Sequence, residues 1–367
     1  MIFKLLKKMV LSLVGLFLLL VILLYFHNQS HAPVTTEEVI PTDESQQIQR
    51  AADNFVNIIK ATQTSYAARG AHAKGHACVK AYFDINKDID PQLQYGIFKT
   101  PGKQFKSWIR FSNGSSNMAK SDDRNKDSRG MAIKILNVSP NKVQTQEFLA
   151  HNSPAFFSTD LKDYNQLVER EDKTKYFLSG YNPFKWRLRE LSHVNDTLSS
   201  PPYSPVWDDY FSNTAYKLGP HNIKFMMRSC SQPLQAKKNT TDPDFLRNTL
   251  VDELNSDSAC MQFFVQLQDA SKLMPIEDPS VLWKETDSPF ISVAKITIPA
   301  QKFDTPEQQQ FCENLSFSPW NTIEAHRPIG ALNRVRKLVY QASSNFRHNI
   351  NKTKPPQNIE FTIIPPP

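Results

Sequence analysis

An uncharged apolar segment near the N-terminus is the feature that most constrains this sequence. Residues 9–26 form an 18-residue stretch without a charged side chain, just long enough for a helix to cross a bilayer. Every face of such a helix is apolar, which argues against a buried helix of a soluble protein. Lys4, Lys7 and Lys8 precede the stretch, and the next lysine or arginine is Arg50. The positive-inside rule then places residues 1–8 in the cytoplasm, a single-pass transmembrane anchor at 9–26, and the remaining chain on the non-cytoplasmic side, periplasmic or extracellular.

A cleaved signal peptide is the alternative interpretation of this segment. The apolar core of a signal peptide is usually shorter, and no small-x-small cleavage site follows Phe26 directly. The chain has four cysteines and no C-x-x-C pair, so the usual signatures of zinc ribbons, iron–sulfur clusters and covalently attached c-type haem are absent. Disulfides are permitted in an exported domain, but the sequence does not reveal their pairing.

The charge of the chain excludes one class of partner. The 43 basic and 36 acidic residues give a net charge of +7, and outside the N-terminus the basic residues are dispersed. We therefore expect no nucleic-acid partner. The excess is compatible with an anionic cofactor or a membrane surface.

The pattern after the anchor predicts a short linker and one α+β domain. Residues 27–43 are polar and contain proline, as in a linker, and residues 44–367 form the expected domain. Apolar residues at helical spacing predict helices over about 43–63 and 329–346. Alternating, β-branched and aromatic runs predict at least six strands, at residues 79–85, 107–112, 130–138, 222–228, 260–268 and 289–299. This pattern favours an antiparallel sheet or barrel with helices packed outside.

Several polar residues stand out against this background. The segment 69–80, RGAHAKGHACVK, places Arg69 and His72 just before a strand, where the imidazole could serve as an acid or base near an anion. A hydrogen-bonded structural histidine is the alternative. In the C-terminal helix, Arg336, Tyr340 and Arg347 share one face. A guanidinium one turn from a phenol favours the phenolate, which can bind a metal; a cation stacked on a surface tyrosine is the alternative.

These residues form part of an ordered set of motifs that resembles the haem catalase family. The segment R-x-x-H-A-K-G is matched at residues 69–75, R-F-S at 110–112, D-x-R-G at 127–130, N-N-x-P-x-F-F in part at 151–157, and the proximal helix R-x-x-x-Y, with a second arginine seven residues later, at 336–347. The similarity covers about residues 65–165 and 310–350. It implies a catalase-like antiparallel β-barrel with surrounding helices.

The resemblance also implies roles for individual residues around a haem b. His72 would be the distal histidine, oriented by Ser112, and Asn152 would be its distal partner. Tyr340 would be the proximal iron ligand, held ionised by Arg336. The haem propionates would pair with Arg69, Arg110 and Arg347, and either Phe157 or Tyr164 would lie near the haem edge.

The sequence departs from the family at several positions. In strict register the distal asparagine falls on His151 rather than Asn152, so a second distal imidazole is the alternative. Ala71 stands where catalases usually carry valine, and the usual Y-x-D-T after the proximal tyrosine is replaced at residues 340–343. The chain ends soon after the proximal helix, as in minimal catalase-like proteins (catalase-related peroxidases).

The resemblance implies a haem-dependent catalase or peroxidase that decomposes hydrogen peroxide in oxidative-stress defence. The alternative within enzymes is a peroxidase or rearranging enzyme that acts on organic (fatty-acid) hydroperoxides. A non-enzymatic haem-binding or sensing module is a further alternative. The implied partners are the peroxide and, through the N-terminal helix, the membrane. Whether the chain forms a homo-oligomer stays open.

Overall fold

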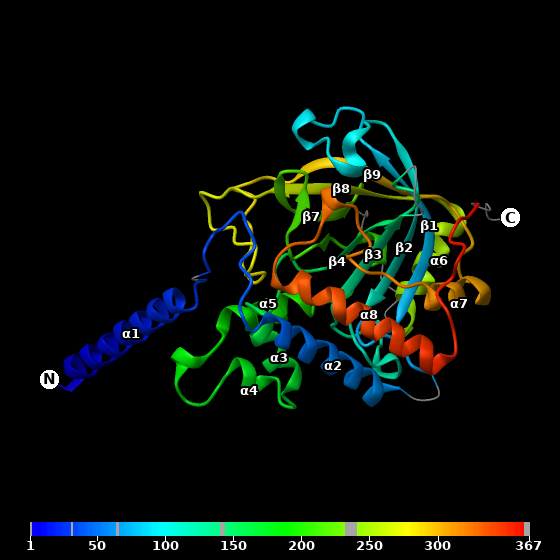
Figure 1. Ribbon diagram of the computed structural model, residues 1–367. Helices are drawn as coiled ribbons and strands as arrows, with labels where there is room; N and C mark the ends of the chain where they lie inside the picture. Colours follow the sequence, from blue (N-terminus) through cyan, green and yellow to red (C-terminus); the bar gives the residue numbers. More distant parts are fainter. Residues whose placement is uncertain (1, 31, 64–65, 140–143, 232–240, 363–367) are drawn as a thin grey trace.

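A closed antiparallel β-barrel forms the centre of the molecule (Figure 1). The structure, a computed structural model, describes residues 2–30, 32–63, 66–139, 144–231 and 241–362. In these residues the strands follow the order β5-β4-β3-β2-β1-β9-β8-β7-β6, and β5 also pairs with β7. That second pairing closes a ring of eight strands, which leaves β6 outside the ring beside β7. The strands are β1 Gly75–Ile85, β2 Gln104–Asn113, β3 Arg129–Ile135, β4 Gln146–His151, β5 Tyr210–Phe211, β6 Tyr216–Leu218, β7 His221–Ser229, β8 Ala259–Leu267 and β9 Ile291–Ile298.

The interior of the barrel is a packed apolar core. Strand β1 shows the alternation that produces it, because Val79, Ala81 and Phe83 point inward and are fully buried. Phe83 and Phe263 meet edge to face with ring centroids 5.4 Å apart. A core of this kind leaves no room for a ligand on the barrel axis, so a functional site is expected outside the barrel interior.

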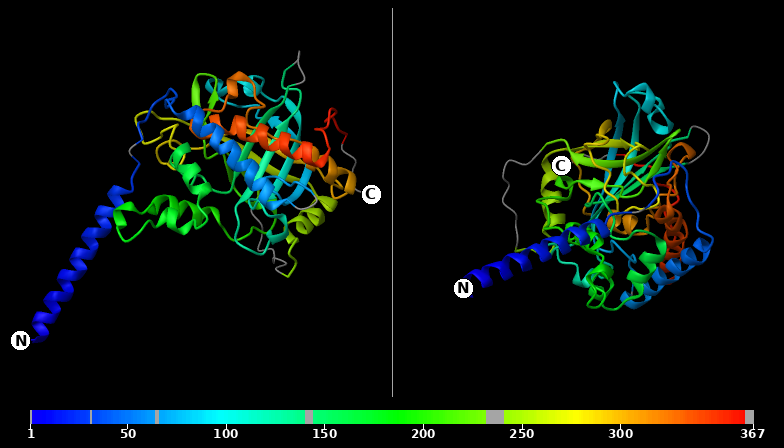
Figure 2. Two further views of the ribbon diagram at one scale, coloured as in Figure 1. Left: turned by 60° about the horizontal axis from the view of Figure 1, so that its bottom comes forward. Right: turned by 90° about the vertical axis from the view of Figure 1, so that its left-hand side faces the viewer.

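The helices pack around this barrel (Figures 1 and 2). Helices α2 and α8 lie side by side along its outer wall, where Ala51 and Ala52 of α2 contact Leu332, Val335 and Val339 of α8. The helices are α1 Ile2–His27, α2 Glu44–Thr62, α3 Leu161–Glu169, α4 Thr174–Phe177, α5 Leu188–Thr197, α6 Phe245–Ser256, α7 Pro306–Asn314 and α8 Ala331–Asn351.

The structure confirms the expected α+β fold with an antiparallel barrel. Both predicted helices are present as α2 and α8, and the six predicted strands are β1, β2, β3, β7, β8 and β9. The sequence analysis missed β4, β5 and β6. Strands β5 and β6 have two and three residues, too few to show an alternation. Strand β4 is only six residues long, and its polar ends hide the apolar centre.

Helix α1 projects away from the rest of the molecule (Figure 2). Its segment Leu6–His27 has a mean hydropathy of 2.9 and none of its most apolar window is buried. Length and composition therefore allow this helix to cross a membrane, and a signal sequence passes the same test.

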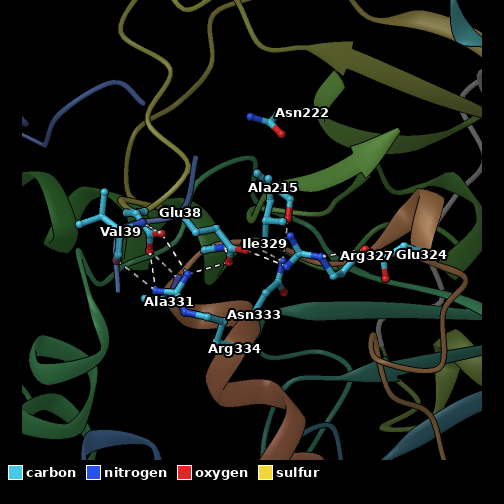
Figure 3. A network of polar contacts seen from close by, with 12 residues as sticks. Glu38, Val39, Ala215, Asn222, Glu324, Arg327, Ile329, Ala331, Asn333 and Arg334 are labelled. Carbon is cyan, nitrogen blue, oxygen red and sulfur yellow. Dashed lines mark hydrogen bonds and ion pairs between the residues drawn. The ribbon is translucent and has the colours of Figure 1, made fainter. Parts of the chain in front are cut away.

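The segment between α1 and α2, described for residues 28–30 and 32–43, was expected to be a linker and lies against the domain. We call this segment the strap. The carboxylate of Glu38 contacts Arg334 at 2.7 Å and Arg327 at 2.7 Å, and Arg334 also contacts Glu44 and Glu277 at 2.6 and 3.0 Å. Figure 3 shows this network at the N-terminal end of α8. Three carboxylates converge on one guanidinium, so the strap is held by charge as well as by backbone contacts.

All four cysteines form disulfides. Cys78 of β1 is bonded to Cys312 of α7, and Cys230 is bonded to Cys260 of β8. The first bond closes a loop of more than 230 residues, with a sequence separation of 234. Two disulfides of this kind are typical of a protein that folds in an oxidising compartment.

Candidate active site

His72 lies against the outer wall of the barrel, over a glycine. A Cβ atom on Gly130 of β3 would come within 2.6 Å of His72 Nδ1 and Cε1, so only glycine leaves room for the imidazole. Ser112, which pairs with Gly130 across β2 and β3, lies 3.2 Å from His72 Nδ1 through its Oγ. The hydrogen bond orients the ring through one nitrogen and leaves Nε2 for other contacts.

The backbone of His72 adopts a left-handed conformation with φ of 55°. A non-glycine residue in this region costs roughly 1–2 kcal/mol, so the surrounding contacts must impose it. The amide of His72 donates to Gly114 O at 3.0 Å, and Arg110 Nη2 donates to His72 O at 2.9 Å. Strain held in place at a polar side chain is typical of functional sites.

His151 lies beside this group, at the end of β4. It pairs with Gly130 on the side opposite Ser112, and residues that pair across antiparallel strands point to the same face of the sheet. Both ring nitrogens of His151 are buried, and within the described part of the chain neither has a hydrogen-bond partner of normal geometry. The row Ser112, Gly130, His151 therefore crosses three strands, with the His72 ring above its centre.

The structure does not bring Asn152 to this group. Asn152 Oδ1 accepts from the backbone amide of Arg129 at 2.8 Å, and Nδ2 donates to Ser199 Oγ at 2.7 Å and Thr197 O at 3.2 Å. The amide is thus fully used in fastening the end of β4 to the chain that follows α5. Successive residues of a strand point to opposite faces, which is why Asn152 turns away where His151 faces His72.

A tyrosine and an arginine on α8 form the second half of the candidate site. Arg336 Nη2 donates to Tyr340 Oη at 3.3 Å, and Nη1 donates to Tyr216 Oη at 3.2 Å. The Arg336 guanidinium also lies 5.3 Å from the centre of the Tyr340 ring. Burial by itself would lower the pKa of Arg336, but Tyr340 and Tyr216 oppose this and the pKa is raised. Arg336 is therefore a fixed positive charge beside the phenol oxygen.

Aromatic side chains surround Tyr340. Phe156 and Tyr164 pack into the cluster that contains it, with ring centroids 5.9 Å apart. Burial, with a smaller contribution from Tyr340, raises the pKa of Tyr164, which keeps that phenol protonated. Phe157 packs against Leu167 and its neighbours under α3 and α4 and stacks on Phe156 with ring centroids 4.2 Å apart. Of the two residues expected at the haem edge, Tyr164 lies in the cluster with Tyr340, and Phe157 adjoins that cluster through Phe156.

Three arginines gather around one carboxylate at the edge of the site. Glu313, at the end of α7, lies 2.6 Å from Arg69, 3.7 Å from Arg347 and 3.8 Å from Arg110. Burial would raise the pKa of Glu313, but the three guanidinium charges outweigh it and lower the pKa. The sequence analysis named the arginines and missed Glu313. Its position directly after Cys312, in a segment without a family motif, gave no signal.

The electrostatic field of the site keeps both imidazoles neutral. Burial, followed by the charge of Arg110, lowers the pKa of His72 to about 4. Burial, followed by His72 and Arg336, lowers the pKa of His151 to about 3, and a hydrogen bond with the Asn213 side chain opposes the shift. The charge of Arg336 contributes to lowering the pKa of both histidines. The guanidinium on α8 therefore lies close to the face of the barrel that carries them. The Tyr340 oxygen could hold a metal here, and the arginines could hold carboxylates.

Two other polar residues of the segment 69–80 serve the fold. Lys74 contacts Asp123 at 2.8 Å and Asp244 at 2.7 Å, while His76 Nε2 lies 2.8 Å from Asn113 Oδ1. Both side chains are buried. They fasten the start of β1 to its neighbours.

Comparison with known proteins points to catalases. A sequence model of the family described as Catalase matches residues 53–177. Catalase A of Pseudomonas putida is 21% identical over 269 residues, which is 66% of this chain and 55% of that protein. The chain thus spans little more than half the length of this relative.

Solved catalase structures share the fold. A fungal catalase and catalase A from Saccharomyces cerevisiae each match with a TM-score of 0.64 and 17% identity, over 90% of this chain and 72% and 74% of theirs. A bacterial catalase matches with a TM-score of 0.59 and 16% identity, over 90% of this chain and 67% of its own.

The barrel, with its facing histidine and tyrosine walls, defines a protein of the catalase fold. The family match over residues 53–177 and the relative in Pseudomonas putida support the assignment of this chain to the haem catalase family.

Proposed function

We propose that this protein is a membrane-anchored, haem-dependent oxidoreductase that decomposes hydrogen peroxide and so protects against oxidative stress. The observation that carries the proposal is that two hydrogen-bonded pairs lie on facing elements, one on the barrel and one on α8. His72, hydrogen-bonded to Ser112, lies on the barrel, and Tyr340, hydrogen-bonded to Arg336, lies on α8. A distal base on one side and a tyrosinate ligand on the other are the arrangement of a catalase haem site.

The chemistry of the donors fits a haem b. Tyr340 would hold the iron, with Arg336 favouring its phenolate, and Arg69, Arg110 and Arg347 would hold the two propionates. The three arginines and Glu313 carry a net charge of +2, which matches two carboxylates. Arg110 Nε is buried and has no hydrogen-bond partner among the residues that the structure describes, so this cluster offers a further donor. The bound haem would supply the redox chemistry.

The residues of this chain would then bind the peroxide and move its proton. A neutral His72, with its pKa at about 4, accepts the proton from one peroxide oxygen at Nε2 and returns it to the other, which leaves as water. Ser112 keeps the ring in the orientation for both transfers. The packed aromatic residues Phe156 and Tyr164 exclude water beside Tyr340.

A peroxidase that acts on organic hydroperoxides is the second candidate. Two observations favour it: the small Ala71 directly before the distal histidine, and His151 in place of an amide. Both change the space and the hydrogen bonding above His72 relative to the family pattern.

One experiment separates these functions. Full-length protein is purified in detergent, supplied with haem, and assayed side by side with hydrogen peroxide and a fatty-acid hydroperoxide for oxygen evolution and for oxidation of a reducing donor. Catalase activity gives oxygen from hydrogen peroxide alone, whereas a peroxidase requires the donor. Haem binding without turnover of either peroxide would leave only the sensing or haem-binding alternative.

Variants test the assignment of Tyr340 as the proximal ligand and of His72 as the distal base. Tyr340→Phe is expected to abolish or strongly change the ferric haem spectrum, whereas the matched Tyr82→Phe, on β1, leaves it unchanged. His72→Ala is expected to retain haem and to lose peroxide turnover by roughly a hundredfold or more. An unchanged spectrum in Tyr340→Phe would contradict the proximal assignment, and full activity in His72→Ala would contradict the distal one.

We further propose that α1 is an uncleaved anchor and that the domain lies on the non-cytoplasmic side. The support is the apolar exposed helix, the preceding lysines and the two disulfides. Carbonate extraction of membranes tests the anchor, and protease digestion of intact cells or spheroplasts tests the side. Release of the protein by carbonate, or a shortened N-terminus, would favour a signal peptide.

A further inference from the structure

We propose that His151 is a second acid–base residue of the distal site, which faces the peroxide together with His72. The proposal rests on the proposed peroxide chemistry and adds to it a residue that replaces the amide of the family pattern. Its basis is the position of His151 in the sheet and the state of its two ring nitrogens.

The register of three strands fixes the position of His151. Ser112, Gly130 and His151 are consecutive partners across β2, β3 and β4. Ser112 Oγ contacts His72 Nδ1, and the His72 ring occupies the space where a Gly130 side chain would project. The side chain of His151 points to the same face, so the two imidazoles are neighbours along one row of the barrel wall.

The ring of His151 has a nitrogen available to a ligand. Buried polar atoms in proteins nearly always have a hydrogen-bond partner, yet among the described residues neither Nδ1 nor Nε2 of His151 has one of normal geometry. The Asn213 amide donates to Ser153 O and also approaches the His151 ring, where its hydrogen bond opposes the lowering of the pKa, but one amide can serve only one of the two nitrogens. Phe156 covers the edge of the ring at 6.2 Å between centroids. A buried ring nitrogen without a protein partner is expected where a substrate supplies the missing partner.

Asn152 offers no substitute, because its amide is already paired on both atoms. An asparagine side chain can donate or accept a hydrogen bond but cannot take up a proton, whereas a neutral imidazole carries one donor and one basic nitrogen. Two imidazoles can therefore contact both oxygens of a peroxide. One accepts the proton, while the other holds the leaving oxygen through its N–H or accepts the proton in turn.

The first test is independent of haem. Full-length protein with 15N-labelled histidine, in detergent and before haem is added, is titrated by NMR. The pKa of His151 is lowered partly by His72, so His72→Gln is expected to move the His151 ring signals and their titration. The matched variant His193→Gln, which replaces a histidine of α5, is expected to leave them unchanged. No response to His72→Gln would overturn the proposed neighbourhood.

The second test compares variants of the haem-loaded protein. His151→Asn keeps an amide donor of the family type and removes the basic nitrogen. We expect it to lower kcat/KM for hydrogen peroxide about tenfold and His151→Ala about a hundredfold, mainly through kcat, with the ferric spectrum retained. Asn152→Ala is expected to lower thermal stability while kcat/KM per haem is retained.

Cyanide provides a readout besides turnover, because hydrogen cyanide gives up a proton when it binds and a distal base receives it. His151→Ala is expected to weaken cyanide binding about tenfold, and to do so again in a His72→Ala background. Wild-type turnover and cyanide affinity in His151→Asn, or lost turnover in Asn152→Ala, would overturn the assignment. Failure of the wild-type protein to bind haem or consume peroxide would instead overturn the proposed function, and leave the NMR result standing.

Discussion

The Glu313 carboxylate lies 2.6 Å from Nη1 of Arg69, at the point where Arg110 and Arg347 also converge. Arg69 further donates to the backbone carbonyls of Cys312 and Leu315 at 2.9 and 3.0 Å, so the end of α7 is wrapped around this guanidinium. The disulfide between Cys312 and Cys78 fixes the same segment to β1. The cluster of three arginines thus contains the carboxylate of Glu313 as its own anion. The disulfide of the preceding residue, Cys312, holds Glu313 in this position.

Glu313→Gln tests what this carboxylate does. Removing the charge leaves three neighbouring guanidinium groups without a counter-ion, so the haem-free protein is expected to lose about 1–3 kcal/mol of unfolding free energy. The same change is expected to strengthen haem binding about tenfold, since the propionates no longer compete with Glu313. Chemical denaturation and haem titration measure the two effects. A loss of both stability and haem affinity would show that Glu313 positions the arginines and does not compete.

Gly130→Ala tests the contact beneath the distal histidine. A methyl group would lie 2.6 Å from the His72 ring, so the imidazole must move away from Ser112. We expect turnover to fall about a hundredfold, while haem binding, which would depend on Tyr340 and the three arginines, is retained. Ser112→Ala removes the hydrogen bond without the collision and is expected to cost about tenfold. Equal activity of Gly130→Ala and the wild type would show that His72 does not need this position.

The buried histidines predict a loss of stability in acid. Burial is the main cause that lowers the pKa of His72 and His326 to about 4, from an ordinary value of 6.5. Between these values the unfolded chain binds protons that the folded protein does not, so stability falls as the pH drops through this range. Above 6.5 these groups contribute no pH dependence. The expected result is a melting temperature that is level above 6.5 and declines steadily toward pH 4, measured by circular dichroism. A level profile down to pH 4 would contradict the burial of neutral histidines.

Arg334→Gln tests how the strap is held. Glu38, Glu44 and Glu277 would lose their shared partner, and breaking a largely buried ion-pair network costs about 3 kcal/mol. We expect faster cleavage after Glu37 and Glu38 by a glutamate-specific protease. Arg327→Gln, which removes a more exposed partner of Glu38, is the matched control with a small effect. Equal cleavage of all three proteins would mean that backbone contacts alone retain the strap.

The sequence predicted the architecture where a pattern repeats over many residues. The stripe on α8 and the alternation in β1 are long enough to specify the element and its buried face, and the barrel follows from them. Arg336, Tyr340 and Arg347 could be placed on one helical face from spacing alone. His72 and Ser112 required the family motifs, because their contact joins residues 40 positions apart.

The orientation of single residues at strand ends could not be predicted in this way. The choice between His151 and Asn152 depends on where β4 ends and on its register with Gly130, and a shift by one residue reverses the face of each side chain. Glu313 was missed because its partners come from three separate segments, which only the folded chain brings together.

The docked strap also sets how far the domain can travel. The 17 residues from 27 to 43, if free, would span up to about 60 Å and let the domain sweep a wide area around its anchor. In the folded protein, Asn28 already accepts a hydrogen bond from the amide of Leu188, and Ser30 donates to Asp278 at 2.6 Å. With α1 in a bilayer, only a few residues between the membrane-spanning helix and the domain would remain free to extend. The enzyme would then work at a fixed height and with one constant side toward the lipid surface.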